Sequence, residues 1–364
     1  MAGTGRRVVV EAFGESPMEA LENHVKVVAQ AAPDPADLAP DDVIVAVRSA
    51  AVGWVDLLMT SGQYQHMATV PYTPGLEYAG DVIWAGPSAT QKVGDRVLAD
   101  GILTGPRSIG AHRKWGGFAS YAVAPTAALR TLPPAWTYDQ GACLLGNYET
   151  AYHCLIARGK LTAADTVLVH GASGSTGLAA VHIAKMVGAT VIATGRNVDK
   201  LARVAEQGAD HTVRVGDDVD MRAEVKDLTG GKGVDVVYDG VGGPISAASL
   251  RCVKFGARYL VVGWAATPFV AKGRGQRGAP NANQLPTNLI MMKGLDVLGC
   301  PTVITTHHDP SVRTERLAAI EAWIAQGVLT PFVERAYAFD ELHEAMWAKW
   351  KSLHVGGCVL HPDP

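Results

Sequence analysis

Short hydrophobic runs separated by glycine and proline fill about the first third of the chain. Runs with strand character occupy residues 6–12, 42–52, 79–86, 95–101 and 118–125. Such runs, without long amphipathic helices between them, are typical of antiparallel sheets and barrels. The pattern therefore predicts a mostly antiparallel, barrel-like unit at the start of the chain.

The pattern changes after about residue 136. Short, wholly apolar runs now alternate with segments of helical periodicity. We expect strands at 166–170, 190–194, 234–239, 258–263 and 295–299, and helices near 175–187, 198–207 and 245–254. Strands that are apolar on both faces and separated by helices indicate a parallel sheet in a doubly wound α/β domain. The partly basic segment 264–287 interrupts this alternation and is expected to be a long loop.

A β-rich pattern returns toward the C-terminus. The pattern predicts, in order, a helix near 310–326, a strand near 332–338, a helix near 340–351 and a strand at 356–361. We therefore expect this tail to rejoin the first domain. The predicted division is a β-rich domain of residues 1–135 and 306–364, and an α/β domain of residues 136–305.

Composition narrows the class of protein. The length of 364 residues fits two domains, and 48% hydrophobic with 18% charged residues is typical of a globular chain. A net charge of -3 gives no basic surplus for nucleic acid, and no apolar run reaches the roughly 18 residues of a membrane span. Because the first residues also lack a signal-peptide pattern, we expect a cytoplasmic protein without nucleic-acid or membrane partners.

Two groups of possible metal-binding residues have simpler interpretations. The 5 cysteines are scattered without a CxxC pair, so we expect small buried hydrophobic residues rather than disulfides or a zinc cluster. His307, His308 and Asp309 immediately precede Pro310. We expect Asp309 to cap a helix that begins at Pro310 rather than to join a metal site.

The strongest local signal is a glycine-rich turn. A buried strand runs directly into Gly171, Gly174 and Gly177, a helix follows, and a second strand comes next. Glycines let the backbone approach a pyrophosphate, and a helix N-terminus presents free N–H groups to its charge. The order of these elements indicates dinucleotide binding rather than a purely structural turn. The residues expected to cradle the pyrophosphate are Gly171, Gly174, Ser175, Thr176 and Gly177.

The end of the second strand indicates which dinucleotide binds. NAD sites usually place an acid there for the ribose hydroxyls. This chain instead has Gly195 and Arg196, with Lys200 one turn later, and its nearest acid, Asp199, is expected in the first turn of the next helix. A guanidinium can bind a 2′-phosphate through paired hydrogen bonds. We therefore expect NADPH, held by Gly195, Arg196 and Lys200; the alternative for Arg196 is a solvated surface arginine.

Several ordered motifs carry a family resemblance over nearly the whole chain. They are DLLMTSGQY (56–64), PGLEYAGDV (74–82), VGDRV (93–97), GGFASYAV (116–123), ETAYHCL (149–155), VDVVYDGVGG (234–243), RYLVVGW (258–264) and NLIMMKG (288–294). With these the chain resembles the medium-chain dehydrogenase/reductase superfamily, in its zinc-free, zeta-crystallin-like quinone oxidoreductase branch. The resemblance implies a GroES-like β-barrel domain built from both chain ends and a Rossmann domain, with the active site in the cleft between them. It also implies a homodimer through the edge of the Rossmann sheet.

The resemblance also bears on metal chemistry. Alcohol dehydrogenases of the superfamily hold a catalytic zinc through Cys, His and Cys, and the matching positions here are Gly53, Leu76 and Gly146. None of these side chains can bind zinc. Zinc-free members transfer hydride from NADPH to quinones, enones and other polarised double bonds. The resemblance therefore implies an NADPH-dependent, zinc-independent reductase of such acceptors, with no metal site.

Further site residues follow from the same resemblance. Thr150, in the TAY motif, is expected beside the nicotinamide, and the backbone around Gly263 and Trp264 is expected to meet its carboxamide. Val241 and Gly242 follow another predicted strand of the sheet, at the edge where open α/β sheets bind ligands. Tyr64, Asp56 and Tyr148 are candidates for proton delivery; the alternatives are tyrosines that pack at the domain boundary and an aspartate that caps a helix.

Two other functions stay open at this point. Lys272, Arg274 and Arg277 lie in the expected loop and suit the phosphates of an acyl-CoA, which would make the protein an enoyl-CoA-type reductase; a solvated loop is the alternative. A nucleotide-binding redox sensor or structural protein with little catalysis is the other candidate. The small-molecule acceptor itself (quinone, enone or enoyl thioester) is not specified by the sequence.

Overall fold

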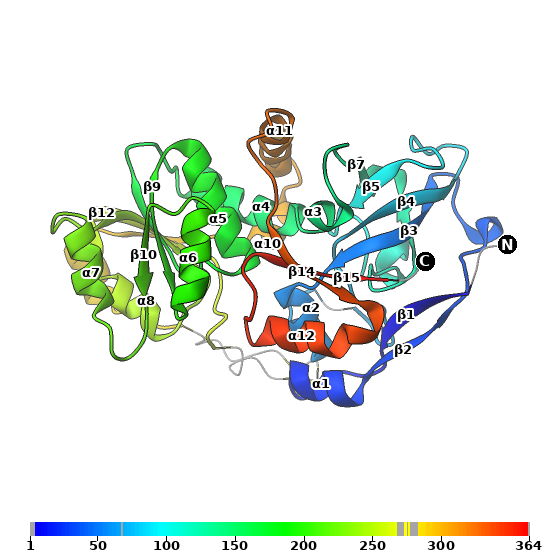
Figure 1. Ribbon diagram of the computed structural model, residues 1–364, viewed down its shortest axis with the longest axis horizontal. Helices are drawn as coiled ribbons and strands as arrows, with labels where there is room; N and C mark the ends of the chain where they lie inside the picture. The colour runs from blue at the N-terminus through cyan, green and yellow to red at the C-terminus, as the bar shows by residue number, and fades with distance from the viewer. Residues whose placement is uncertain (1–3, 67, 268–272, 275, 277–282, 363–364) are drawn as a thin grey trace. The chain divides into compact units, whose positions relative to one another are not determined.

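The computed structural model describes residues 4–66, 68–267, 273–274, 276 and 283–362 (Figure 1). The chain divides into two compact units. Unit 1 comprises residues 1–146, 271–278 and 331–364, and unit 2 comprises residues 147–270 and 279–330. These limits differ from the predicted domain boundaries after residues 135 and 305. The physical reason at the second boundary is that Arg313 and Arg316, both buried, pair with Glu149 inside unit 2.

Unit 2 contains a six-stranded sheet in the order β10-β9-β8-β11-β12-β13. Its strands are β8 (Thr166–Val169), β9 (Thr190–Gly195), β10 (His211–Arg214), β11 (Val234–Asp239), β12 (Val253–Val261) and β13 (Asp296–Gly299). Every pair is parallel. The order reverses between β8 and β11, and ligands of such sheets bind beyond the carboxyl ends of the strands at this switch point. The predicted doubly wound Rossmann sheet is confirmed.

Helices precede, connect and follow the strands of this sheet. They are α4 (Leu145–Tyr152), α5 (Ser175–Val187), α6 (Val198–Glu206), α7 (Met221–Leu228), α8 (Pro244–Ser249), α9 (Thr287–Lys293), α10 (Thr302–His308) and α11 (Val312–Ala325). The helix expected to begin at Pro310 begins at Val312, and α10 precedes it. Asp309 follows α10, and its carboxylate accepts hydrogen bonds from the N–H and the hydroxyl of Ser311, so it does not cap α11 as predicted.

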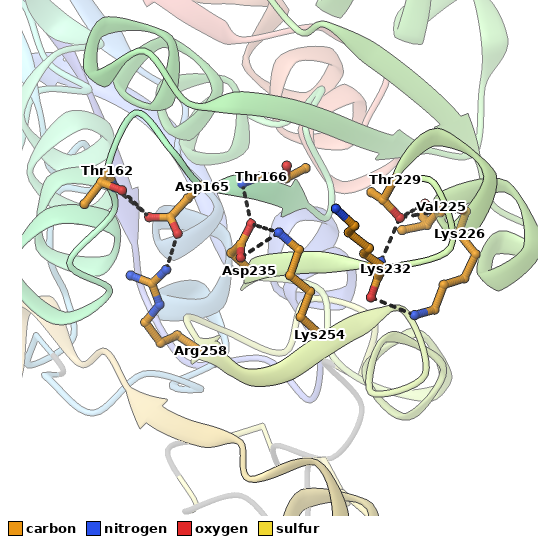
Figure 2. A network of polar contacts seen from close by, with 11 residues as sticks. Thr162, Asp165, Thr166, Val225, Lys226, Thr229, Lys232, Asp235, Lys254 and Arg258 are labelled. Carbon is orange, nitrogen blue, oxygen red and sulfur yellow. Dashed lines mark hydrogen bonds and ion pairs between the residues drawn. The ribbon is translucent and has the colours of Figure 1, made fainter.

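Ion pairs hold the strands of this sheet near their amino-terminal ends (Figure 2). Arg258 of β12 pairs with Asp165, just before β8, at 2.5 Å. Lys254 pairs with Asp235 of β11 at 2.7 Å, and Asp235 also accepts the N–H of Thr166 at 2.8 Å. These contacts tie three central strands together at the edge opposite the glycine-rich turn, so charged side chains there have structural partners.

Unit 1 contains a mostly antiparallel sheet in the order β14-β15-β3-β4-β5-β7, with β6 paired to β3. Its strands are β3 (Asp42–Ala51), β4 (Tyr78–Ala85), β5 (Arg96–Ala99), β6 (Tyr121–Pro125), β7 (Leu129–Thr131), β14 (Val333–Ala338) and β15 (Gly357–His361). A separate two-stranded antiparallel sheet pairs β1 (Gly5–Val10) with β2 (Val25–Gln30), which follows it in the chain after a helix. Val359 of β15 lies opposite Ala51 of β3, so the C-terminal strand completes the N-terminal sheet. The helices of this unit are α1 (Pro17–Asn23), α2 (Trp54–Thr60), α3 (Tyr138–Ala142) and α12 (Leu342–Trp350).

Candidate functional site

The glycine-rich turn joins β8 to α5, and two of its glycines are required by the geometry. Gly171 has φ of +64°, in the left-handed region that favours glycine. A Cβ on Gly177 would overlap the carbonyl oxygen of Gly171 and lie 2.9 Å from its carbonyl carbon. Gly174 is the N-cap residue of α5. The turn is therefore as tight as close approach to a pyrophosphate requires.

Helix α5 supplies the charge complement for a phosphate. It runs over 13 residues from Ser175, and its N-terminus meets the glycine turn. The first N–H groups of a helix have no intrahelical partner and carry partial positive charge. The hydroxyl of Thr176 donates to Asn147 Oδ1 at 3.1 Å, which fixes that side chain against α4. Ser175 and Thr176 are both half-buried.

Two cations follow β9. Arg196 is exposed, and Lys200 is half-buried in the first turn of α6. Burial and the nearby Arg196 guanidinium both lower the pKa of Lys200. Asn197 caps α6 by accepting the N–H of Lys200 at 2.9 Å, and Asp199 lies exposed in the first turn of this helix. The segment after β9 therefore presents two cations, and its one carboxylate, Asp199, lies in α6 rather than directly at the end of the strand.

The loops that follow β11 and β12 contact each other. A Cβ on Gly242, where φ is +75°, would lie 3.0 Å from Cα of Trp264. The N–H of Ala266 donates to the carbonyl of Val241 at 2.8 Å. On the other side, a Cβ on Gly171 would lie 3.0 Å from Cγ2 of Val241. The carboxyl edge of the sheet thus brings together Gly171, Val241, Gly242, Gly263 and Trp264.

A buried carboxylate shapes the loop after β11. Asp239 Oδ1 accepts the N–H groups of Val241 and Gly242, both at 2.9 Å, and Oδ2 accepts the hydroxyls of Ser246 and Tyr259, both at 2.5 Å. Burial acts to raise the pKa of Asp239, but nearby His170 and these hydrogen bonds outweigh it and lower the pKa. Asp239 therefore stays ionised and holds the loop in one conformation.

Helix α4 carries two of the predicted residues. Thr150 is half-buried. Tyr148 is 3% exposed, and its hydroxyl lies 2.7 Å from His182 Nδ1 and 3.4 Å from the carbonyl of Thr330. Between them, Glu149 is buried against Arg313 and Arg316 of α11. The Tyr148 hydroxyl is therefore engaged within unit 2.

Asp56 and Tyr64 belong to unit 1. Asp56 is 2% exposed and accepts the N–H groups of Gly53, Gly75 and Leu76 at 3.0–3.1 Å. Burial raises its pKa to about 6, although these N–H groups act in the opposite direction. Asp56 thus holds the start of α2 against the turn at Gly75. Tyr64 is half-buried, and its ring lies in a T-shaped arrangement with that of His66, with 6.2 Å between the ring centroids.

The three positions that match zinc ligands hold no donor side chain. Gly53 begins α2, Leu76 is buried in the core of unit 1, and Gly146 donates its N–H to the carboxylate of Glu77. Across the described ranges, the structure contains no group of three or more His, Cys, Asp or Glu residues arranged to hold a metal ion.

The basic loop is described only in part. Lys272 and Arg277 lie outside the described residues. Arg274 pairs with Glu15 at 2.5 Å, with both side chains largely exposed, and its N–H donates to the carbonyl of Gly14. The described part of this loop therefore has a carboxylate partner within unit 1.

Three residues that shape the candidate site through their hydrogen bonds were not predicted from the sequence: Asn147, His170 and Asp239. Asp239 carried a usable signal, because an acid at the end of the apolar run VDVVYD must find partners when it is buried. The partners of His170 and Asn147 come from distant parts of the chain, so no local pattern reveals them.

Comparison with known families matches both units. Residues 39–134 match the alcohol dehydrogenase GroES-like domain, and residues 175–308 match the zinc-binding dehydrogenase family. No helix in the described ranges combines the length and apolar character needed to cross a bilayer.

Individual relatives cover most of the chain. A quinone oxidoreductase-like protein 2 homolog from Nematostella vectensis is 31% identical over 328 residues, which is 89% of this chain and 83% of that protein. The crystal structure of a probable oxidoreductase from Mycobacterium abscessus is 27% identical with a TM-score of 0.79, over 99% of both chains. The Escherichia coli quinone oxidoreductase, solved with NADPH, is 24% identical with a TM-score of 0.78, over 98% of this chain and 100% of that chain, and shares the fold.

Proposed function

Because the chain belongs to the medium-chain dehydrogenase/reductase superfamily, in its quinone oxidoreductase branch, we propose that it is an NADPH-dependent reductase that needs no zinc. Its acceptors are quinones or other activated double bonds. The observation that carries the proposal is the glycine turn at the switch point of the sheet. There a Cβ on Gly177 would fill the space that the backbone of Gly171 already occupies.

The residues of unit 2 fit an NADPH molecule. Gly171, Gly174 and the start of α5 would hold the pyrophosphate, and Arg196 with Lys200 would hold the 2′-phosphate. Thr150 and the loops at Val241, Gly242, Gly263 and Trp264 would hold the nicotinamide end. Bound NADPH supplies a hydride, so the part of this chain is to bind and orient the nucleotide and to exclude water.

The chemistry of the acceptor explains why the proposed reaction needs no zinc. An alcohol needs a Lewis acid or a general base to lose its hydride readily, and Gly53, Leu76 and Gly146 offer no ligand for a metal ion. A quinone or an enone is already electrophilic. One hydride and one proton convert a quinone to a hydroquinone. A proton must therefore also reach the acceptor in the site.

Tyr64 is the proposed proton source among the three predicted residues. The Tyr148 hydroxyl is bonded to His182, and Asp56 accepts three backbone N–H groups. Tyr64 is half-buried, and in the described part of the chain its hydroxyl has no hydrogen-bond partner that would compete with a substrate. Solvent water is the competing source, and Tyr64→Phe distinguishes the two through the pH dependence of kcat.

We also propose a homodimer that pairs two copies of β13. This strand ends the sheet, and within the described residues it pairs with β12 alone. Val297 in the strand is 38% exposed, and nearby Met291 and Phe255 are 74% and 84% exposed. An edge strand flanked by exposed apolar side chains is a template for pairing with another chain.

An acceptor panel tests the proposed reaction. NADPH oxidation is followed with 1,2-naphthoquinone, a simple enone, an alkenal and a crotonyl thioester, each with and without a metal chelator. We expect turnover of the quinone or the enone, unchanged by the chelator. Loss of activity with chelator contradicts the zinc-free proposal. A strong preference for the thioester indicates an enoyl-CoA-type reductase, and nucleotide binding without turnover of any acceptor indicates a sensor or structural protein.

A further inference from the structure

A buried histidine joins the strand ends that carry the proposed nucleotide site. His170 lies between β8 and Gly171 and is 1% exposed. Its Nδ1 lies 2.8 Å from Thr194 Oγ1 in β9, and its Nε2 lies 2.6 Å from Ser249 Oγ in α8. One imidazole ring therefore links the glycine turn to two other elements of unit 2.

The surrounding hydrogen bonds assign the tautomer. The Ser249 hydroxyl donates to the carbonyl of Ile245 at 2.6 Å, so its oxygen accepts from His170 Nε2–H. Nδ1 then accepts from the Thr194 hydroxyl, whose other acceptor, the carbonyl of Val169, is farther away at 3.4 Å. Burial lowers the pKa of His170 to about 4, which keeps the ring neutral near pH 7. Both ring nitrogens are thus engaged within the protein, and His170 acts on a ligand only through the groups that it holds.

The first of these groups is Thr194. Its carbonyl accepts the N–H of Ala172 in the glycine turn at 3.2 Å, and its hydroxyl bonds to His170. Thr194 is fully buried and directly precedes Gly195 and Arg196. The backbone and side chain of Thr194 together set the position of Arg196 relative to the pyrophosphate cradle.

The second group is helix α8. Ser249, at its end, accepts from His170, and Ser246, one turn earlier, donates to Asp239. Asp239 in turn fixes the N–H groups of Val241 and Gly242. We call the hydrogen bonds that start at each side of the His170 ring its Thr194 arm and its Ser249 arm. The Ser249 arm leads from the glycine turn to the loop after β11 and does not reach the end of β9.

We propose that His170 is a positioning residue whose two arms control different properties of nucleotide binding. The Thr194 arm sets the preference for NADPH over NADH, because it orients the residues proposed to bind the 2′-phosphate. The Ser249 arm sets the affinity for both nucleotides alike. This inference rests on the proposed function, since it requires a nucleotide at the glycine turn.

Single-hydroxyl variants of the full chain separate the two arms, with the dissociation constants of NADPH and NADH measured for each. Thr194→Val removes one hydroxyl at nearly constant volume and should lower the ratio of NADPH to NADH affinity about fivefold, the value of one hydrogen bond. Thr194→Ser keeps the hydroxyl and should restore the ratio. Ser249→Ala should weaken the binding of NADPH and of NADH about equally. Val225→Ala, a buried change in α7 outside this network, controls for loss of stability.

The outcomes distinguish the inference from the proposed function. A wild type that prefers NADPH, with a ratio that Thr194→Val changes no more than Val225→Ala does, overturns the inference and leaves the function standing. A wild type that prefers NADH overturns the choice of NADPH, but a ratio that still moves with Thr194→Val supports the inference. A wild type that binds neither nucleotide overturns both. Thr194→Ala gives the same comparison if the valine variant does not fold.

Discussion

At the scale of single residues, charge decides which nucleotide the proposed site prefers. Arg196 is exposed at the end of β9, and Lys200 lies one turn later with a lowered pKa. A 2′-phosphate placed between two cations gains from both of them, whereas a ribose hydroxyl gains little. The proposed preference for NADPH therefore depends on Arg196, an exposed side chain that can be changed without disturbing the core.

Arg196→Asp should shift the nucleotide preference from NADPH toward NADH. The carboxylate repels a 2′-phosphate and can accept the ribose hydroxyls of NADH, so we expect at least a tenfold fall in the ratio of kcat/KM for NADPH to that for NADH. Arg222→Asp makes the same charge change at an exposed position of α7 and should leave the ratio unchanged. An unchanged ratio in the Arg196 variant would remove this residue from the site.

The raised pKa of Asp56 predicts that the stability of unit 1 depends on pH. Burial raises its pKa from 3.8 to about 6, so between these values the folded state holds a proton that the unfolded state has released. The free energy of unfolding therefore falls as pH rises through this window, by about 3 kcal/mol in total, and stays flat above it.

Asp56→Asn removes this titration. Denaturant unfolding of the variant and the wild type at pH 4, 5, 6 and 7 should give a difference in unfolding free energy that changes steadily up to about pH 6 and is constant above it. Taking the difference removes the contribution of every other titrating group. Parallel pH profiles for the two proteins would show that Asp56 has an ordinary pKa in the folded state.

At the scale of elements, a buried ion cluster joins α4 to α11. Arg313 Nε and Arg316 Nε both lie 2.8 Å from Glu149 Oε2, and all three side chains are almost fully buried. Removing one partner of such a cluster leaves buried charge without compensation, which costs about 3–5 kcal/mol. Thr150 directly follows Glu149 in α4.

Glu149→Gln should therefore destabilise unit 2 by several kcal/mol, measured as a fall in the midpoint of denaturant unfolding. Asp218→Asn, which breaks the exposed pair with Arg214, is the matched control and should change the midpoint little. A glutamine variant as stable as the wild type would mean that the two arginines find other partners.

Strands with strong apolar patterns are predictable from the sequence, whereas some short, weakly buried elements are not. The expected strands at β8, β9 and β11 are confirmed, because each is nearly all apolar and buried. β10 and α7 were missed, since β10 buries only Val213 and α7 only Met221 and Val225. The glycine turn could be predicted because only glycine fits its tight backbone, so the requirement is written in the sequence itself. The roles of His170 and Asp239 were not, because they depend on hydroxyl and amide groups that only the folded sheet brings near.

At the scale of the whole molecule, the proposed dimer depends on one strand edge. Val297→Asp places a charge on β13, where like charges would face each other across the pair of strands. We expect a monomer by light scattering at micromolar concentration, with nucleotide binding retained. Val328→Asp, at a position that is 56% exposed outside the sheet, should stay dimeric. A Val297 variant that remains dimeric would place the interface elsewhere.

The pairing of β15 with β3 has a consequence for how the protein is made. Every strand of the sheet in unit 2 has left the ribosome once residue 299 emerges, so that sheet can form while synthesis continues. β3 must wait for residues 357–361 before this partner is available. Until then part of its edge stays open to strands from other nascent chains, and slow translation over the last sixty or so codons would prolong that exposure. Supplying the missing strand in trans as a peptide should therefore raise the soluble yield of a chain truncated before β15.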